Sequence, residues 1–213
     1  MAYLIGNGKA YYLASLYPAL LGVGALPVAE WTMRSHRGSL RTIALSAGVA
    51  ASIASSALIA LPLLPTAALQ GSVVMAINPD QGETVGWPRF IATVSRAWQS
   101  IPPAGREQTV IFTANYGEAG AVDLLGASHG LPVAYSGHNA FSDWGQPPAS
   151  ATHALVIGYQ DPSDAAPYFG GCAALGRIDD EVDLDNQEQG LPVMLCHPTA
   201  SWATLWPHLR HDN

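Results

Sequence analysis

Charge is scarce in this sequence. Only 12% of the 213 residues are charged, against about 25% in a typical soluble domain. The charges are also unevenly placed, because residues 1–65 carry four basic residues and one acid, whereas residues 66–213 carry five arginines and fifteen acids. An acidic surface opposes binding to phosphates, so this balance excludes a nucleic-acid-binding domain. No internal repeat or low-complexity tract is present, and the asymmetry indicates two segments in different environments.

Two stretches of the first segment contain no charge. Residues 10–29 and 42–65 are each long enough to cross a hydrocarbon core of about 30 Å at a rise of about 1.5 Å per residue. A signal peptide that begins after Lys9 is one alternative, although it would not need the second run. A buried helical hairpin of a soluble protein is another, although both runs lack a polar face. We therefore expect two transmembrane helices.

The loop between these runs predicts the orientation. It carries Arg34, Arg37 and Arg41, so the positive-inside rule places residues 31–41 in the cytoplasm and residues 66–213 outside it, in a multi-pass protein of the cell membrane. Small residues recur every four positions in the second run, which favours close packing against another membrane helix. The alternative is that small residues are simply frequent in such helices. These residues are Ala44, Gly48, Ser52, Ser56 and Ala60.

Residues 66–213 predict a small extracytoplasmic α/β domain with a mostly parallel sheet, because apolar strand-like runs alternate with helical patterns. Pro88 and the pair Asn115 and Glu118 mark two helix starts. The predicted strands are residues 71–77, 109–114, 131–136, 152–159 and 192–196. The predicted helices are residues 89–101, 115–128, a short one within 161–175, and 200–209.

Three motifs suggest chemistry but have simpler explanations. GASHG at residues 126–130 fits a nucleophile elbow at Ser128, but a predicted helix precedes it and a strand follows, which is the reverse of the required order. DDEVDLDNQEQG at residues 179–190 lacks the glycine that a calcium loop needs at its sixth position. His208 and His211, with His197 nearby, have no carboxylate or cysteine at ligand spacing. We therefore predict no catalytic residue, no metal site and no cofactor.

One loop and the two cysteines are better candidates. YSGHNAFSDWG at residues 135–145 follows a predicted strand, where α/β sheets often bind ligands. Its aromatic and amide groups suit a sugar, although a purely structural turn is the favoured explanation of the loop. Cys172 and Cys196 fall in the extracytoplasmic segment, where a disulfide is expected. The candidate ligand-binding residues are Tyr135, His138, Asn139 and Trp144.

Several stretches together resemble a known family over nearly the whole chain. They are GKAYYLASLYPALL, NPDQGETVGWP, ANYGEAGAVDLLG, LPVAYSGHNAFSDWG and GRIDDEVDLDNQEQGLPVMLC. The chain resembles the C-terminal part of bacterial membrane glycosyltransferases that use polyprenyl-phosphate sugars and are related to protein O-mannosyltransferases and aminoarabinose transferases. The resemblance implies two final membrane helices and an extracytoplasmic domain. It also implies transfer of a sugar from a lipid phosphate carrier to an acceptor outside the cytoplasm.

In that family the catalytic carboxylate belongs to an acidic first extracytoplasmic loop, which this sequence does not match, so the chain is expected to be inactive alone. The resemblance also suggests that Lys9, Tyr11 and Tyr12 meet the carrier phosphate. Anchoring of these side chains at the lipid interface is the alternative. The expected partners are membrane lipid, a lipid-phosphate-linked sugar and further transmembrane helices of the same enzyme. A stand-alone binding module for a separate catalytic membrane subunit is the second function we consider.

Overall fold

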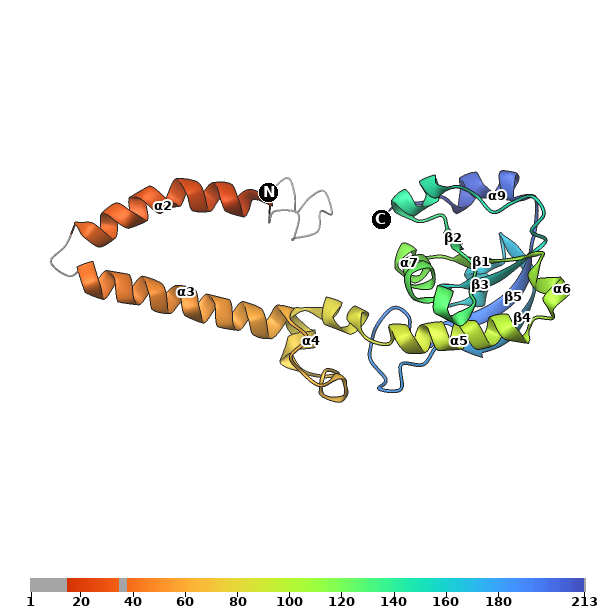
Figure 1. The fold of residues 1–213 in the computed structure, drawn as a ribbon, viewed down its shortest axis with the longest axis horizontal. Helices are drawn as coiled ribbons and strands as arrows, with labels where there is room; N and C mark the ends of the chain where they lie inside the picture. Colours follow the sequence, from red (N-terminus) through yellow and green to blue (C-terminus); the bar gives the residue numbers. More distant parts are fainter. Residues whose placement is uncertain (1–14, 35–37, 213) are drawn as a thin grey trace. The chain divides into compact units, whose positions relative to one another are not determined.

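The computed structural model describes residues 15–34 and 38–212 of the chain, which divides into two compact units, Met1–Leu61 and Pro62–Asn213. The first unit contains α2 (Tyr17–Met33) and α3 (Gly38–Ala60). Neither helix has a buried residue. Figure 1 shows both as single long helices.

Only α3 among the described residues is long and apolar enough to cross a membrane. The structure therefore does not support the multi-pass topology predicted from two spans at residues 10–29 and 42–65. α2 starts at Tyr17 and continues to Met33, so it includes Glu30, which pairs with Arg34. The second predicted span ends early, at Ala60, because prolines follow at 62 and 65 and cannot continue a helix.

The second unit is built on a five-stranded sheet of order β2-β1-β3-β5-β4. β1 pairs in parallel with both β2 and β3, whereas β5 pairs antiparallel with β3 and β4. The prediction of an α/β domain is confirmed, and the mostly parallel character holds for the central strands. No helix forms in residues 178–191, so β4 and β5 lack the crossover that parallel neighbours need. The strands are β1 (Thr109–Thr113), β2 (Ala134–Ser136), β3 (His153–Ile157), β4 (Phe169–Arg177) and β5 (Pro192–Pro198).

Helices cover both faces of the sheet (Figure 1). α5 (Trp87–Ser100) and α7 (Tyr116–Leu125) share one hydrophobic core with Ile111 and Leu155. α9 (Trp202–Leu209) belongs to a second core with Val110, Phe112 and Val156. Neighbouring residues of a strand thus enter opposite cores, as the pleat requires, and β1 is buried along its whole length because both of its faces are covered.

One predicted element is wrong. Residues 71–77 form the short helix α4 (Val73–Ile77), because Ser72 caps it by accepting a hydrogen bond from the Met75 N–H at 3.2 Å. The short helix predicted within residues 161–175 is present as α8 (Pro162–Ala165), and it stops after one turn, since Pro167 follows it and the chain then enters β4. The other short helices are η2 (Thr66–Ala68), η3 (Pro79–Thr84), α6 (Pro103–Arg106), η4 (Ala127–His129) and η5 (Asn139–Trp144).

A third, smaller core joins the start of this unit to the loop before β5. Leu69 and Val74 pack there with Leu184. Two hydrogen bonds support the contact, from Asp185 N–H to Gln70 Oε1 and from the Asn186 side chain to the Gly82 carbonyl. Residues 62–85 are thus part of the second unit and not a free linker.

A disulfide joins Cys172 of β4 to Cys196 of β5, with an S–S distance of 2.07 Å. The predicted pairing is therefore present, although Cys172 lies on a strand and not on the expected helix. The bond lies close to the start of β3, because Cys196 is paired with Ala154 in the sheet.

Candidate functional site

The carboxyl ends of the parallel strands β1, β2 and β3 meet at one edge of the sheet, which we call the carboxyl edge. The chain passes from β1 through α7 to β2 on one side and then crosses to β3 on the other side of β1. The strand order therefore reverses between β1 and β3. Ligands of open α/β sheets bind in the crevice outside such a point.

The start of α7 supplies the first side chains of this edge. Asn115 directly follows β1 and caps the helix, because its Oδ1 accepts a hydrogen bond from the Gly117 N–H at 2.7 Å. Glu118 completes a capping box by accepting from the Asn115 N–H at 3.3 Å. Tyr116 between them is 46% exposed. The predicted N-x-x-E signal therefore places an amide, a carboxyl group and an accessible aromatic ring at the end of β1.

Side-chain amides connect this helix start to two other loops. The Asn115 amide donates to Gln187 Oε1 at 3.0 Å, and Gln160, which follows β3, donates to the Gln187 carbonyl at 3.0 Å. The Gln187 N–H donates to Glu83 Oε2 at 3.3 Å. One of these bonds joins the Asn115 and Gln187 side chains, and the other joins the Gln160 side chain to the Gln187 backbone. Both bonds are exposed, so the network lies at the surface.

Glu118 is a buried carboxyl group below this network. Burial raises its pKa to about 8, the Asn115 N–H lowers it, and the nearby Glu188 raises it further. Gly158, which follows β3 with φ +98°, leaves room for this carboxyl group, because a Cβ there would collide with Glu118 Oε2 and Ala114. At neutral pH Glu118 is therefore protonated and can donate a hydrogen bond as well as accept one.

Glu188 is a second buried acid at the same edge. Burial raises its pKa to about 7, and the charge of Glu83 and a side-chain hydrogen bond with Glu83 add to the shift. Glu188 Oε2 has no hydrogen-bond partner. A small cavity of about 10 Å³ next to Glu188 is lined by Trp87 and Gln189 among others, which is room for about one water molecule.

The predicted loop after β2 contributes two of its four candidates to the carboxyl edge. His138 is buried against Tyr116, with ring centroids 4.8 Å apart, and its Nδ1 accepts from the Tyr116 N–H at 3.4 Å. It also stacks on His211 of the C-terminal segment at 4.6 Å. Asn139 follows with φ +50° and donates its N–H to the His211 carbonyl at 2.8 Å. His138 and Asn139 therefore join the C-terminal segment to the loop after β2, and the His138 ring contacts both Tyr116 and His211.

The other two candidates of that loop lie elsewhere. Tyr135 belongs to β2 and packs against the second core. Trp144 ends η5 and packs on Phe141, with centroids 4.4 Å apart, while most of its side chain stays exposed.

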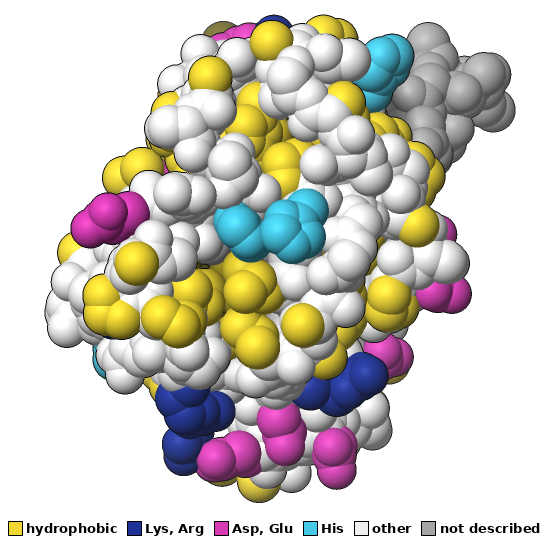
Figure 2. All heavy atoms as spheres, turned by 90° about the vertical axis from the view of Figure 1, so that its right-hand side faces the viewer, with side chains coloured by type: hydrophobic (Ala, Val, Ile, Leu, Met, Phe, Trp, Pro, Cys, Tyr) yellow, Lys and Arg dark blue, Asp and Glu magenta, His cyan; other side chains and the backbone are white. Residues whose placement is uncertain are grey.

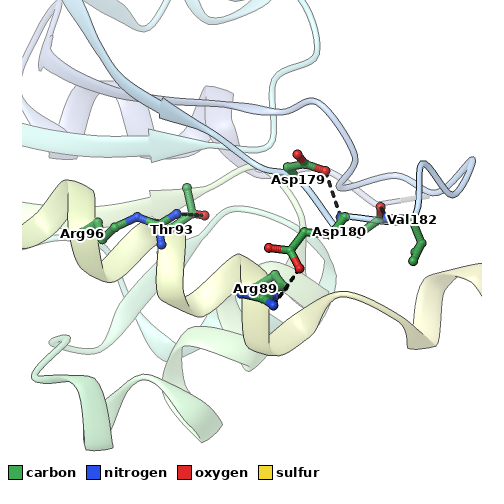
Figure 3. Close-up of polar contacts among 7 residues, drawn as sticks. Arg89, Thr93, Arg96, Asp179, Asp180 and Val182 are labelled. Carbon is green, nitrogen blue, oxygen red and sulfur yellow. Dashed lines mark hydrogen bonds and ion pairs between the residues drawn. The ribbon is translucent and has the colours of Figure 1, made fainter.

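The motifs with simpler explanations are structural. Ser128 lies in η4, and its hydroxyl donates to the Leu125 carbonyl at 3.1 Å, as expected for a helix stop. In the acidic loop, Asp180 accepts from the Val182 and Leu184 N–H groups. Figure 3 shows this loop beside α5, where Arg89 pairs with Glu181 at 2.6 Å.

His197 lies on β5 opposite His153 of β3, and their ring centroids are 4.3 Å apart, whereas His208 is on α9. The described part of the chain contains no group of three or more His, Cys, Asp or Glu side chains that could hold a metal ion.

The opposite edge of the sheet, where β1 and β3 begin, contains a groove of about 310 Å³. Thr152, Pro198 and Trp202 line it among small residues, and the Trp202 indole donates to the Ala151 carbonyl at 2.8 Å. Figure 2 shows the corresponding face, with histidine side chains near its centre and charged ones near its rim. Burial and the neighbouring His197 lower the pKa of His153. We call this end the amino edge.

The sequence did not point to the buried acids or to the amides of the carboxyl edge. Glu118 could have been found, since N-x-x-E directly after an apolar strand places its carboxyl group at the strand end. Glu188 and Gln187 could not, because they come from a loop more than 60 residues further along the chain. Lys9, Tyr11 and Tyr12 lie outside the described residues. No family model, curated protein or solved structure matches this chain.

Proposed function

We propose that this chain is the C-terminal part of a membrane glycosyltransferase that uses a polyprenyl-phosphate sugar, and that its second unit binds sugar hydroxyl groups at the carboxyl edge. One observation carries the proposal. Amides of Asn115, Gln160 and Gln187 and buried carboxyl groups of Glu118 and Glu188 meet where the strand order reverses. The sequence resemblance supports it independently, since NYGEAGA and SGHN encode this edge.

The chemistry of the edge suits a polyol. A sugar hydroxyl group both donates and accepts hydrogen bonds, so it needs partners that can also do both. Side-chain amides offer both functions, and a protonated carboxyl group does too. The exposed face of Tyr116 supplies an apolar surface for the ring carbons.

Recognition and transfer are separate in this proposal. The resemblance assigns the transfer step to an acidic loop that this sequence does not match. A general base must lie within hydrogen-bond reach of the acceptor hydroxyl, and Glu118 is engaged in its own helix cap. The chain alone is therefore expected to bind a sugar ligand without transferring it.

Binding of sugar ligands to the full chain in lipid nanodiscs tests the proposal. Titration calorimetry would use a short-chain polyprenyl-phosphate mannose and free mannosides as probes. Gln187→Ala should weaken binding about 5- to 10-fold, since a net hydrogen bond is worth about 1 kcal/mol. Gln99→Ala, an exposed glutamine on α5, serves as the matched control. Equal affinity of the two variants, or no binding by the unmodified chain, would contradict the proposal.

A second candidate is a membrane-anchored module that docks on a separate catalytic subunit. It is favoured by α3, whose residues are all unburied in this chain, and by Gly48, where an added Cβ would meet no atom within 4 Å. The ridge of small residues on α3 would receive the partner helix. Gly48→Leu should abolish co-purification of such a subunit, whereas Leu45→Ala on another position of α3 should not.

A further inference from the structure

The charge-free part of the sequence is longer than the helix that could cross a membrane. No charged residue occurs between Arg41 and Asp80, but α3 ends at Ala60. Residues 61–79 are thus also uncharged, although they lie beyond the span and open the second unit. A surface segment that faces water on all sides normally carries charges.

This segment exposes aliphatic side chains on α4. Val73 is 74% and Ile77 is 58% exposed. They are four residues apart, so they lie on the same face of the helical turn. Val74 on another face is buried with Leu69 and Leu184 in the third core. The orientation of α4 is therefore set by packing, and the packing leaves Val73 and Ile77 outside.

The third core also makes this face a fixed part of the domain. Ser72 caps α4, and Gly71 before it has φ +71°, a conformation that favours glycine. The Gln70 side chain binds the loop before β5 through the Asp185 N–H at 3.1 Å. The exposed Val73 and Ile77 thus lie on a helix that is held in place by contacts with residues more than 100 positions away in the sequence.

Lipid is the occupant that the chain connectivity favours. Residues 61–72 are the only connection between α3 and α4, and twelve residues span at most about 40 Å when fully extended. If α3 crosses a bilayer, α4 lies within that distance of the bilayer surface. We propose that Val73 and Ile77 rest among the lipid headgroups and upper acyl chains, so that α4 docks the second unit on the membrane. This inference rests on the membrane anchoring in the proposed function.

Lipid contact can be measured with single-cysteine labels, because both native cysteines are in the disulfide. Val73→Cys and Ile77→Cys would carry an environment-sensitive fluorophore in the full chain, reconstituted in phosphatidylcholine–phosphatidylglycerol vesicles. Leu124→Cys on α7, where the leucine is 81% exposed, is the matched control. Ile53→Cys in α3 reports whether that helix is inserted. Spin-labelled lipids then quench only those fluorophores that contact the bilayer.

We expect quenching at positions 73 and 77 to exceed that at position 124 at least threefold, with blue-shifted emission. Emission at 73 and 77 that matches position 124, while position 53 is quenched, would overturn the proposal. Blue-shifted emission without lipid quenching would also overturn it, because a protein surface then covers the face. An unquenched label at position 53 would mean that α3 is not inserted in the bilayer, and this result would also overturn the proposal. Sugar binding is measured in a separate experiment, so the absence of lipid contact at α4 would not contradict the sugar-binding site at the carboxyl edge.

Discussion

The two edges of the same sheet are stabilised by different means. The carboxyl edge is joined by side-chain amides and by the capping box of α7, with a close approach at Gly158, and it contains two buried acids whose pKa values are raised by burial. The amino edge has a covalent bond between β4 and β5, a pair of histidines and a groove lined by small residues. Volume alone would favour the amino edge as a ligand site. The reversal of the strand order and the converging polar groups favour the carboxyl edge. We give these two features more weight than the volume of the groove at the amino edge.

The largest expected difference between the edges comes from their glycines. Gly158→Val should destabilise the second unit by about 4 kcal/mol, because a left-handed residue gains a Cβ that overlaps Glu118 and Ala114. Gly170→Ala at the amino edge should change stability little, since the nearest atom to an added Cβ is 3.9 Å away. Thermal unfolding followed by tryptophan fluorescence measures both. Similar melting temperatures for the two variants would show that the carboxyl edge is not tightly packed.

Reduction of the disulfide should have the next largest effect and should act on the amino edge. The bond closes a loop with a sequence separation of 24, so its loss is expected to destabilise the unit by about 3 to 4 kcal/mol. Unfolding with and without a phosphine reductant measures this. Cys172→Ala should reproduce the reduced protein and make it insensitive to the reductant. A reductant effect that persists in Cys172→Ala would assign the change to something other than this bond.

The pH dependence of the free energy of unfolding should come largely from the carboxyl edge. The raised pKa of Glu118, about 8 against an ordinary 4.5, means that the folded chain holds a proton which the unfolded chain has lost. Stability is therefore full below about pH 4.5 and is lost as the pH rises toward 8, at up to about 1.4 kcal/mol per pH unit. Glu118→Gln keeps the capping geometry and should reduce this slope in melts between pH 5 and pH 8, whereas the part that comes from the raised pKa of Glu188, about 7, should remain. Glu107→Gln, at an exposed site, should leave it unchanged.

The smallest effect is expected for the ion pair of Arg89 and Glu181 (Figure 3). Both side chains are about half exposed, so Arg89→Ala should cost less than about 1 kcal/mol. Added salt should reduce even that difference. Chemical denaturation at low and high salt measures it. A loss of several kcal/mol would mean that the acidic loop depends on this pair more than on its own backbone hydrogen bonds.

Local signals in the sequence predicted much of the fold. The start of α5 at Trp87, next to Pro88, and the capping box of α7 depend on residues within one helical turn, so the sequence reveals them directly. The antiparallel pairing of β4 with β5 depends on contacts across a long loop and was not predicted. Residues 73–77 are rich in β-branched side chains and read as a strand, but the Ser72 cap and the packing of Val74 make them helical.

The candidate site was predicted only in part for the same reason. His138 and Asn139 follow a recognisable strand, and their position at its end could be expected. The perturbed acid Glu188 could not be foreseen, because its pKa depends on burial and on Glu83, about a hundred residues earlier. The predicted pair of membrane spans is supported only at α3 among the described residues, since the absence of charge in residues 10–29 did not specify where α2 begins and ends.

The outer position of β4 has a consequence for how the protein behaves at high concentration. The strand forms the edge of the sheet, and residues 171–174 are exposed and uncharged. Such an edge is a template for pairing with another molecule. Two register shifts interrupt its ladder with β5, and the disulfide holds it against that neighbour. Reduction would therefore free an edge strand that can pair with other molecules, in addition to lowering stability. Light scattering of reduced samples would then rise with protein concentration, while oxidised samples remain monodisperse.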